Sequence, residues 1–260
     1  MNRKSVLVKA LKAAGEVILH YDLNRLESQA KSSVGDLVTS ADLESEKIIR
    51  NIIANDLPDD LLISEETAEG QDLLTVNKLH ELSGWVIDPI DGTNNFIRGM
   101  RYSGVSIGYI ENGSIVLGGI INPYTDEIYL AETGKGATCN GQLILVSSKT
   151  IFDKNTRVCT SNFQENGGTL ENLARYQKLG DVWVDSLGSA VLIMVDVASG
   201  KLDLYHHNGL KPWDNAAGFL ILSEAGAKIV GLKGEPISWL SNEVVAGNPL
   251  LVDEFIRLTS

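Results

Sequence analysis

Two Asn-Gly dipeptides strongly restrict the fold of the first half of the chain. Asn112-Gly113 separates the apolar runs SGVSIGYI and SIVLGGII, and Asn140-Gly141 stands between EIYLAE and QLILVSS. Asn-Gly between alternating apolar runs is the strongest local signal of a β-hairpin, because both residues tolerate the positive φ angles that the turn requires. The spacing therefore predicts a mainly antiparallel sheet of short strands over residues 103–148.

Helices are expected before this sheet. Residues 3–21 repeat apolar side chains every three or four positions, which is the spacing of one face of an amphipathic helix. A second helix is predicted to begin after Thr39 or Ser40 and to stop before Pro58, since proline cannot continue it. The following LLISEETAEG, residues 61–70, runs from an apolar triplet into two glutamates. This pattern is typical of a short strand that delivers acids to a loop.

The second half alternates strands with helices. RVCTS, VWV, LDLYHH, AKIVG and NEVVAG indicate strands, whereas GSAVLIMVDVASG and WDNAAGFLILSEAG indicate helices that end at a glycine. Asn248-Pro249 should begin a last helix, because proline is favoured at the first helical position. We expect an N-terminal α+β half, residues 1–148, and a C-terminal α/β half, residues 149–260. No flexible linker separates them, so they should pack as one unit.

Charge and cysteine content exclude several classes of protein. The formal net charge is -12, so the surface should repel the phosphate backbone of nucleic acids. The chain has only two cysteines, Cys139 and Cys159, which argues against a disulfide framework or a thiolate metal site and favours the cytoplasm. Neither a signal-peptide core nor an apolar run of about 18 residues occurs, so no membrane partner is expected.

The stretch WVIDPIDGTNNF places Asp88 and Asp91 at the end of an apolar run, around Pro89 and before Gly92. Proline interrupts the hydrogen-bond ladder and glycine permits a tight turn, so both carboxylates can face one point at the end of a strand. Two carboxylates about 4 Å apart repel by roughly 4 kcal/mol at an effective dielectric constant near 20. Such a pair needs a shared proton or a cation, and the glutamates that end the preceding strand favour a cation.

The available donors near this stretch are oxygen atoms, which select hard cations such as Mg²⁺, Mn²⁺ or Ca²⁺. An EF-hand is not expected, because the loop from Asp88 lacks the terminal acid that such a loop requires. Gly92-Thr93-Asn94 should form the first turn of a short helix, where backbone N–H groups attract anions. Alternatively, Asp91 or Thr93 only caps that helix.

Other motifs accompany this one along the chain. They are GDLVTSAD at residues 35–42, SEET at 64–67, KGATCNGQ at 135–142, GSAV at 188–191, PWDNAAG at 212–218 and SEAGA at 223–227. Together with DPIDGTNNF, residues 88–96, they closely resemble the inositol monophosphatase family of Mg²⁺-dependent, lithium-sensitive sugar phosphatases. The resemblance covers essentially the whole chain in the order of the family, and the combination is far more specific than any single motif.

The resemblance implies a layered α-β-α-β-α sandwich, a homodimer, and hydrolysis of a phosphate monoester by a metal-activated water. Inositol 1-phosphate is the default substrate, and two or three Mg²⁺ ions are expected, with Mn²⁺ as a substitute. The implied metal ligands are Glu65, Asp88, the Ile90 carbonyl, Asp91 and Asp214. The residues implied to orient the attacking water are Asp42, Glu65 and Thr93.

Some of these residues have alternative interpretations. Thr39-x-x-Asp42 also matches a capping box, and Asp214 could be only a favourable charge at the start of a helix. Glu66 could ligate a metal or merely support its neighbour Glu65. These alternatives remain open at the level of the sequence.

The implied substrate contacts depart from the family pattern at two positions. Relatives that act on inositol phosphate usually have glutamate at the position of His207 and arginine at the position of Asp185. His207 could be a neutral donor and acceptor, a partner of Asp185, or a surface residue without a role. The other implied contacts of the substrate are Gly92, Thr93, Asn94 and Ala190.

Both departures affect substrate specificity and leave the implied metal ligands intact. The alternative substrates are fructose 1,6-bisphosphate, histidinol phosphate, phosphoadenosine phosphate and an aminosugar phosphate. An alternative of a different class is a regulatory binding protein with weak phosphatase activity. The complete set of implied ligands argues against that alternative.

Overall fold

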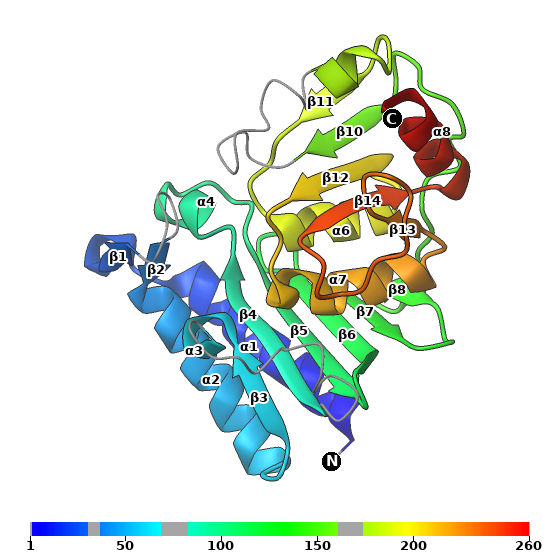
Figure 1. Ribbon diagram of the computed structural model, residues 1–260. Coiled ribbons are helices and arrows are strands. Elements are labelled where there is room, and N and C mark those ends of the chain that lie inside the picture. Colours follow the sequence, from blue (N-terminus) through cyan, green and yellow to red (C-terminus); the bar gives the residue numbers. More distant parts are fainter. Residues whose placement is uncertain (1, 31–36, 69–82, 161–173, 260) are drawn as a thin grey trace.

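The computed structural model describes residues 2–30, 37–68, 83–160 and 174–259 (Figure 1). A short 3-10 turn, η1 (Leu23–Arg25), precedes a two-stranded ribbon of β1 (Ser28–Ala30) and β2 (Leu37–Thr39). The helices whose bounds lie within the described residues include α1 (Arg3–His20), α2 (Ser40–Asp56), α3 (Glu65–Ala68), α4 (Thr93–Ile97), α6 (Ala190–Ala198), α7 (Pro212–Glu224) and α8 (Pro249–Thr259).

Two larger sheets contain the remaining strands. The first has the order β3 (Leu61–Ser64), β4 (Gly84–Asp91), β5 (Gly104–Glu111), β6 (Ser114–Asn122), β7 (Glu127–Glu132), β8 (Ala137–Cys139) and β9 (Gln142–Leu143). Its β3 and β4 are parallel, and the strands after β4 pair antiparallel. The second has the order β11 (Trp183–Asp185), β10 (Arg157–Thr160), β12 (Leu204–Asn208), β14 (Glu243–Gly247) and β13 (Lys228–Val230).

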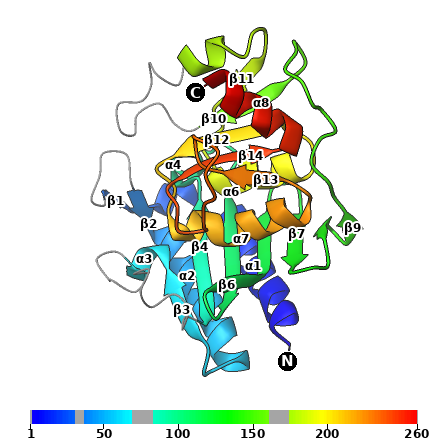
Figure 2. The same ribbon diagram turned by 45° about the vertical axis from the view of Figure 1, so that its right-hand side comes forward.

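Helices and sheets alternate in five layers. α1 and α2 pack on one face of the seven-stranded sheet, and α6 and α7 lie between the two sheets (Figures 1 and 2). α8 covers the outer face of the five-stranded sheet. Three apolar cores fill the four interfaces between these layers, since each helix layer buries apolar side chains against a sheet; the core around α6 and α7 contacts both sheets. The predicted α-β-α-β-α sandwich is therefore confirmed.

The hairpins form where the Asn-Gly dipeptides predict them. Asn112 and Gly113 have φ angles of 50° and 79°, and Asn140 and Gly141 have 48° and 81°, as the tight turns between antiparallel strands require. The prediction that QLILVSS is a strand is wrong beyond Leu143, where β9 ends. The chain leaves the sheet there because the Val146 N–H bonds to the Ala225 carbonyl at the end of α7, at 3.1 Å.

The strand before the acids also differs from expectation. β4 continues through Pro89 to Asp91, with an irregular register between Asp88 and Asp91 opposite β5. The irregularity accommodates the proline, which has no N–H for the ladder. The carbonyl of Pro89 instead accepts a 2.9 Å hydrogen bond from the buried Ser45 hydroxyl of α2. The glutamates after β3 likewise begin the one-turn helix α3 rather than a loop.

Close packing of α7 on the sheet depends on two paired glycines. Gly108 of β5 and Gly118 of β6 are register partners. A β-carbon on Gly108 would lie 2.9 Å from the β-carbon of Ala216, and one on Gly118 would lie 3.1 Å from the α-carbon of Ala217. The absent side chains let the first turns of α7 lie directly on the sheet.

Gly108→Ala should therefore destabilise the protein. The new methyl would meet a helix that cannot yield locally, and overpacking of this kind costs about 1–3 kcal/mol. A thermal denaturation scan should show a melting temperature lower by several degrees, at roughly 2–4 °C per kcal/mol. Gly15→Ala in α1 is the control, because the nearest atom there is the flexible tip of Ile121 at 3.0 Å. Equal melting temperatures for both variants would contradict this account of the packing.

The division at residue 148 into two halves stays a prediction. Of the sequence motifs, Gly35, Asp36, Glu69 and Gly70 lie outside the described residues. Within the described ranges, no helix has both the length and the apolar character that a membrane span needs.

Candidate active site

Three carboxylates from distant parts of the chain meet where β4 ends and α7 begins. One oxygen atom from each of Asp88, Asp91 and Asp214 lies within 4.8 Å of the others. Asp88 is 2% exposed, and the other two side chains are partly buried. The two aspartates of β4 thus face one point, as predicted from the sequence, and α7 brings the third to it.

Asp214 is held in place by the first turn of α7. Pro212 begins this helix, and the Lys211 N–H donates to Asp214 Oδ2 at 2.8 Å. Asp214 is therefore more than a favourable charge at the start of a helix, because it accepts a capping hydrogen bond and also belongs to the acidic cluster. Capping satisfies a backbone donor and also restricts the rotamer of the carboxylate.

Asp91 is held by the start of α6, on the other side of the cluster. The hydroxyl of Ser189 and the N–H of Val191 both donate to Asp91 Oδ2, the latter at 3.1 Å. Asn95 secures the approach of this segment, because its side-chain amide donates to the Leu187 carbonyl at 2.8 Å. One carboxylate thereby connects the end of β4 to the helix layer between the sheets.

Burial makes the negative charge of the three carboxylates unfavourable when no cation is bound. It raises the pKa of Asp88 well above its usual value, and the charges of Glu65 and Asp91 raise it further. Burial also raises the pKa of Asp214, as does the charge of Asp91. The pKa of Asp91 rises to about 6 through burial, although the hydrogen bonds from Ser189 and Val191 oppose the rise.

The cluster fits a hard divalent cation. Its donors are carboxylate oxygens, and all three lie close enough together to contact one ion at metal–oxygen distances of about 2.0–2.6 Å. A cation would also offset the desolvation that raises the pKa values of the three acids. The site can therefore hold a metal ion.

Comparison with known proteins agrees with the family resemblance seen in the sequence. The model of the inositol monophosphatase family matches residues 2–259. The chain belongs to the inositol monophosphatase family. It is 35% identical over 249 residues to inositol-1-monophosphatase of Bacillus subtilis, covering 93% of this chain and 90% of that protein. It is 30% identical to the fructose-1,6-bisphosphatase/inositol-1-monophosphatase of Thermotoga maritima, covering 100% of this chain and 96% of that protein.

The fold of a solved relative agrees with this membership. The extragenic suppressor protein suhB of Bartonella henselae superimposes with a TM-score of 0.89 at 28% identity, over 99% of this chain and 98% of that one. Inositol monophosphatases are phosphoric monoester hydrolases, and the chain is an enzyme of that class.

Two of the three residues that the family resemblance assigns to the attacking water, Asp42 and Thr93, lie together. Thr93 Oγ1 is 3.4 Å from Asp42 Oδ1 and donates to the Ile90 carbonyl at 3.0 Å. Asp42 is also part of a capping box, because its Oδ2 accepts the Thr39 N–H at 2.8 Å. Asp42 thus has one oxygen on the helix cap and the other toward Thr93.

Glu65 lies at the edge of the acidic cluster. It is the first residue of α3 and is partly buried. Its charge is close enough to raise the pKa of Asp88, Asp91 and Asp214. It is not one of the three acids whose oxygens lie within 4.8 Å of one another. The neighbouring Glu66 is also partly buried.

Asp185 and His207 are not partners. Asp185 ends β11 and accepts from Arg157 Nη2 at 2.8 Å and Nε at 3.0 Å. His207 lies on β12, and β10 separates the two strands. Burial lowers the pKa of His207 to about 4, so the ring is neutral near pH 7. Its Nδ1 is buried and has no hydrogen-bond partner among the described residues, which contradicts a plain surface histidine.

The remaining predicted substrate contacts lie around the start of α4 and α6. Gly92 precedes α4 with a φ of 86°, and a β-carbon there would lie 3.1 Å from the β-carbon of Ser189. Asn94 is exposed in the first turn of α4, whereas Ala190 begins α6 and its N–H stabilises the charge of Asp91.

Sequence reasoning missed three residues that hold the site together. Ser189, Ser45 and Asn95 bond to Asp91, to the Pro89 carbonyl and to the Leu187 carbonyl, respectively. A signal existed only for Ser189, because serine directly before an apolar helix is a common N-cap. Nothing local distinguishes Ser45 or Asn95 from other polar residues near a helix start.

Proposed function

We propose that this enzyme hydrolyses the phosphate monoester of a small polyol or sugar with the help of Mg²⁺, and that inositol 1-phosphate is its default substrate. The observation that supports this most directly is the convergence of Asp88, Asp91 and Asp214 on one point beside the Asp42–Thr93 pair. A phosphate ester carries negative charge, so these acids could approach it only with cations between them.

In this proposal Glu65, Asp88, the Ile90 carbonyl, Asp91 and Asp214 hold two or three Mg²⁺ ions, with Mn²⁺ as a substitute. When bound, the ions lower the pKa of a water molecule and neutralise charge on the phosphate and the leaving oxygen. Glu65, Asp42 and Thr93 orient that water, and its proton passes through the Thr93 hydroxyl to the Asp42 carboxylate. The backbone N–H groups of Gly92 and Thr93 hold phosphate oxygens, with Asn94 and Ala190 nearby.

Thr93 is well placed for its part of this task. Its hydroxyl hydrogen is directed to the Ile90 carbonyl or to Asp42, at 3.0 and 3.4 Å. The hydroxyl oxygen then retains a lone pair that can accept a proton from water, and Asp42 can receive the hydroxyl proton in turn. By family resemblance we also propose a homodimer that works in the cytoplasm.

A second candidate substrate is a different phosphorylated metabolite. The neutral His207, whose Nδ1 has no hydrogen-bond partner among the described residues, favours it, because a neutral imidazole contacts a hydroxyl differently from the glutamate usual in relatives that act on inositol phosphate. Fructose 1,6-bisphosphate is the leading alternative, since the name of the Thermotoga maritima relative includes that activity. Histidinol phosphate, phosphoadenosine phosphate and an aminosugar phosphate follow.

Phosphate release across these substrates tests the proposal. The assay contains Mg²⁺, and a parallel reaction contains a chelator in place of the metal. A kcat/KM above roughly 10⁴ M⁻¹s⁻¹ for inositol 1-phosphate would establish it as the substrate. A higher value for another ester would support the second candidate. If no ester releases phosphate faster with Mg²⁺ than with the chelator, the proposed phosphatase function is refuted.

His207→Glu should change the substrate preference. If the carboxylate makes the hydrogen bond to a substrate hydroxyl that glutamate makes in the family, kcat/KM for inositol 1-phosphate should rise by about tenfold, as a charge-assisted hydrogen bond can provide. His207→Gln is the control, because it is neutral and similar in reach. A rise of equal size in the glutamine variant, or the same change for every ester, would show that the charge at this position does not select the substrate.

A further inference from the structure

One buried face of α2 contacts both β4, which carries Asp88 and Asp91, and β3, which leads into Glu65. Asp42, Ser45 and Glu46 are three and four positions apart, so they share a side of the helix. They are 0%, 0% and 5% exposed. Asp42 lies beside Thr93, and Ser45 donates to the Pro89 carbonyl of β4. The third residue, Glu46, points instead toward β3.

Glu46 is held by two donors on opposite oxygens. Arg50 Nε donates to Oε1 at 2.5 Å, and the hydroxyl of Ser64 donates to Oε2 at 2.7 Å. Ser64 is fully buried as the last residue of β3, and its hydroxyl oxygen accepts the Glu66 N–H at 3.3 Å. A continuous set of hydrogen bonds therefore leads from α2 to the first turn of α3, which begins at Glu65.

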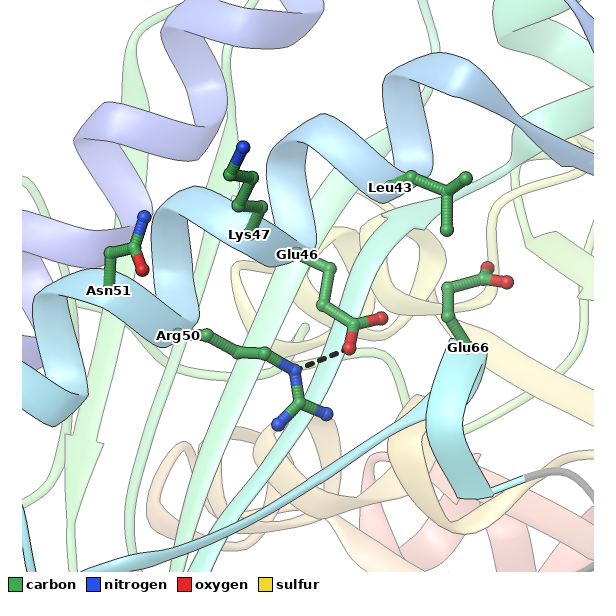
Figure 3. A pocket seen from close by; sticks show the side chains of 6 residues that line it. All are labelled: Leu43, Glu46, Lys47, Arg50, Asn51 and Glu66. Carbon is green, nitrogen blue, oxygen red and sulfur yellow. Dashed lines mark hydrogen bonds and ion pairs between the residues drawn. The ribbon is translucent and has the colours of Figure 1, made fainter.

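The two oxygens of Glu46 have different surroundings. Arg50 lies at a shallow surface hollow of about 230 Å³, which Glu46 lines together with Leu43, Lys47, Asn51 and Glu66. Figure 3 shows the Glu46 carboxylate between Arg50, to which a dashed line joins it, and the segment that bears Glu66. The Arg50 side chain is 35% exposed, whereas that of Glu46 is 6% exposed. Water can therefore replace Arg50 at Oε1. No such replacement is available at the buried Ser64 hydroxyl.

A buried carboxylate is costly, and an apolar residue would fill the same space without that penalty. We propose that Glu46 is a positioning residue: through Ser64 it orients the first turn of α3 and so the Glu65 carboxylate relative to Asp88. The inference rests on the proposed metal site. It predicts that the inner hydrogen bond of Glu46 affects metal affinity, whereas the outer ion pair mainly affects stability.

The test measures Mg²⁺ binding by calorimetry and Mn²⁺ binding by electron paramagnetic resonance, together with melting temperatures, on the full chain. Ser64→Ala and Glu46→Gln should each weaken metal binding by about 10- to 100-fold, the usual effect of losing a group that orients a ligand. The double variant should bind about as weakly as either single variant, because both act through one contact. Ser64→Thr retains the hydroxyl and should bind nearly as tightly as the parent.

Two controls separate positioning from stability. Ile53→Val shortens a side chain on α2 that is 2% exposed, and it should lower the melting temperature without weakening metal binding. Arg50→Met removes the outer partner of Glu46 and should leave the affinity within about threefold of the parent, because water can enter the hollow. These variants calibrate how far a general loss of stability alters the affinity.

The outcomes are distinct. Metal affinity of Ser64→Ala equal to that of the parent, with a lower melting temperature, would show that Glu46 only stabilises the fold. If Glu46→Gln does not fold, the metal affinities of Ser64→Ala and Ser64→Thr are compared instead. Equal affinities would contradict the positioning role. If the parent protein binds neither Mg²⁺ nor Mn²⁺, the proposed function itself is wrong and the positioning role fails with it.

Discussion

Replacing Asp88 with asparagine should abolish turnover and at the same time stabilise the metal-free protein. Asp88 is 2% exposed, and burial raises its pKa well above the usual value. A bound cation supplies several kcal/mol of charge stabilisation to the reaction, so its loss should reduce the rate by on the order of 10³-fold or more. The neutral amide avoids the desolvation cost of the carboxylate and the repulsion from Glu65 and Asp91.

The two effects have separate measurements. Phosphate release in the presence of Mg²⁺ reports the loss of turnover, and thermal denaturation in a chelator reports the expected gain of several degrees in melting temperature. Asp126→Asn is a matched control, since Asp126 is exposed and has a φ of 54° that asparagine adopts readily. A variant that lost turnover and was also less stable without metal would instead indicate damage to the fold.

The metal-free protein should lose stability as the pH rises through the neutral range. The folded-state pKa values of Asp88, Asp91 and Asp214 lie above those of the unfolded chain. Their contribution to stability is therefore complete below about pH 4 and is lost as the pH rises through the folded values, about 6 for Asp91. Between about pH 5 and 7.5 we expect Asp91 alone to cost about 1 kcal/mol, and the other two to add to that cost.

Metal should reverse this trend, because a cation binds the deprotonated carboxylates. At a free concentration of 100 times the dissociation constant, Mg²⁺ would stabilise the folded state by about 2.7 kcal/mol. Melting temperatures with Mg²⁺ and with a chelator should therefore diverge more at pH 7.5 than at pH 5. In Asp88→Asn this divergence should largely disappear. A metal-free melting temperature that increases over the same interval would show that the three acids do not dominate the pH dependence.

The sequence contains short-range information that could be interpreted correctly without the structure. The Asn-Gly turns, the start of α2 at its capping box and the start of α8 at Pro249 depend on residues within one turn of each other. Asp88 and Asp91 converge for the same reason, because they lie three residues apart around a proline. Wrong predictions arose where a distant segment intervenes, as at Val146, whose N–H bonds to the end of α7.

The composition of the site, in contrast, was decided by tertiary packing. Asp214 reaches Asp88 because Gly108 and Gly118 allow α7 to lie against the sheet, and family resemblance alone had suggested that proximity. The pairing of Asp185 with Arg157 likewise depends on which strands are neighbours in the second sheet. Burial, which makes His207 neutral and raises the pKa of Asp88, is a property of the packed layers.

Local preferences thus account for the hairpins, most of the helix boundaries and the pair of acids on β4, since steric and capping effects act between near neighbours in the chain. Which carboxylates share a site, what holds each of them and which ionisable groups lose contact with water depend instead on the packed fold. Those properties depend on distances between residues far apart in the sequence and on the exclusion of solvent, which exist only after the layers have packed together.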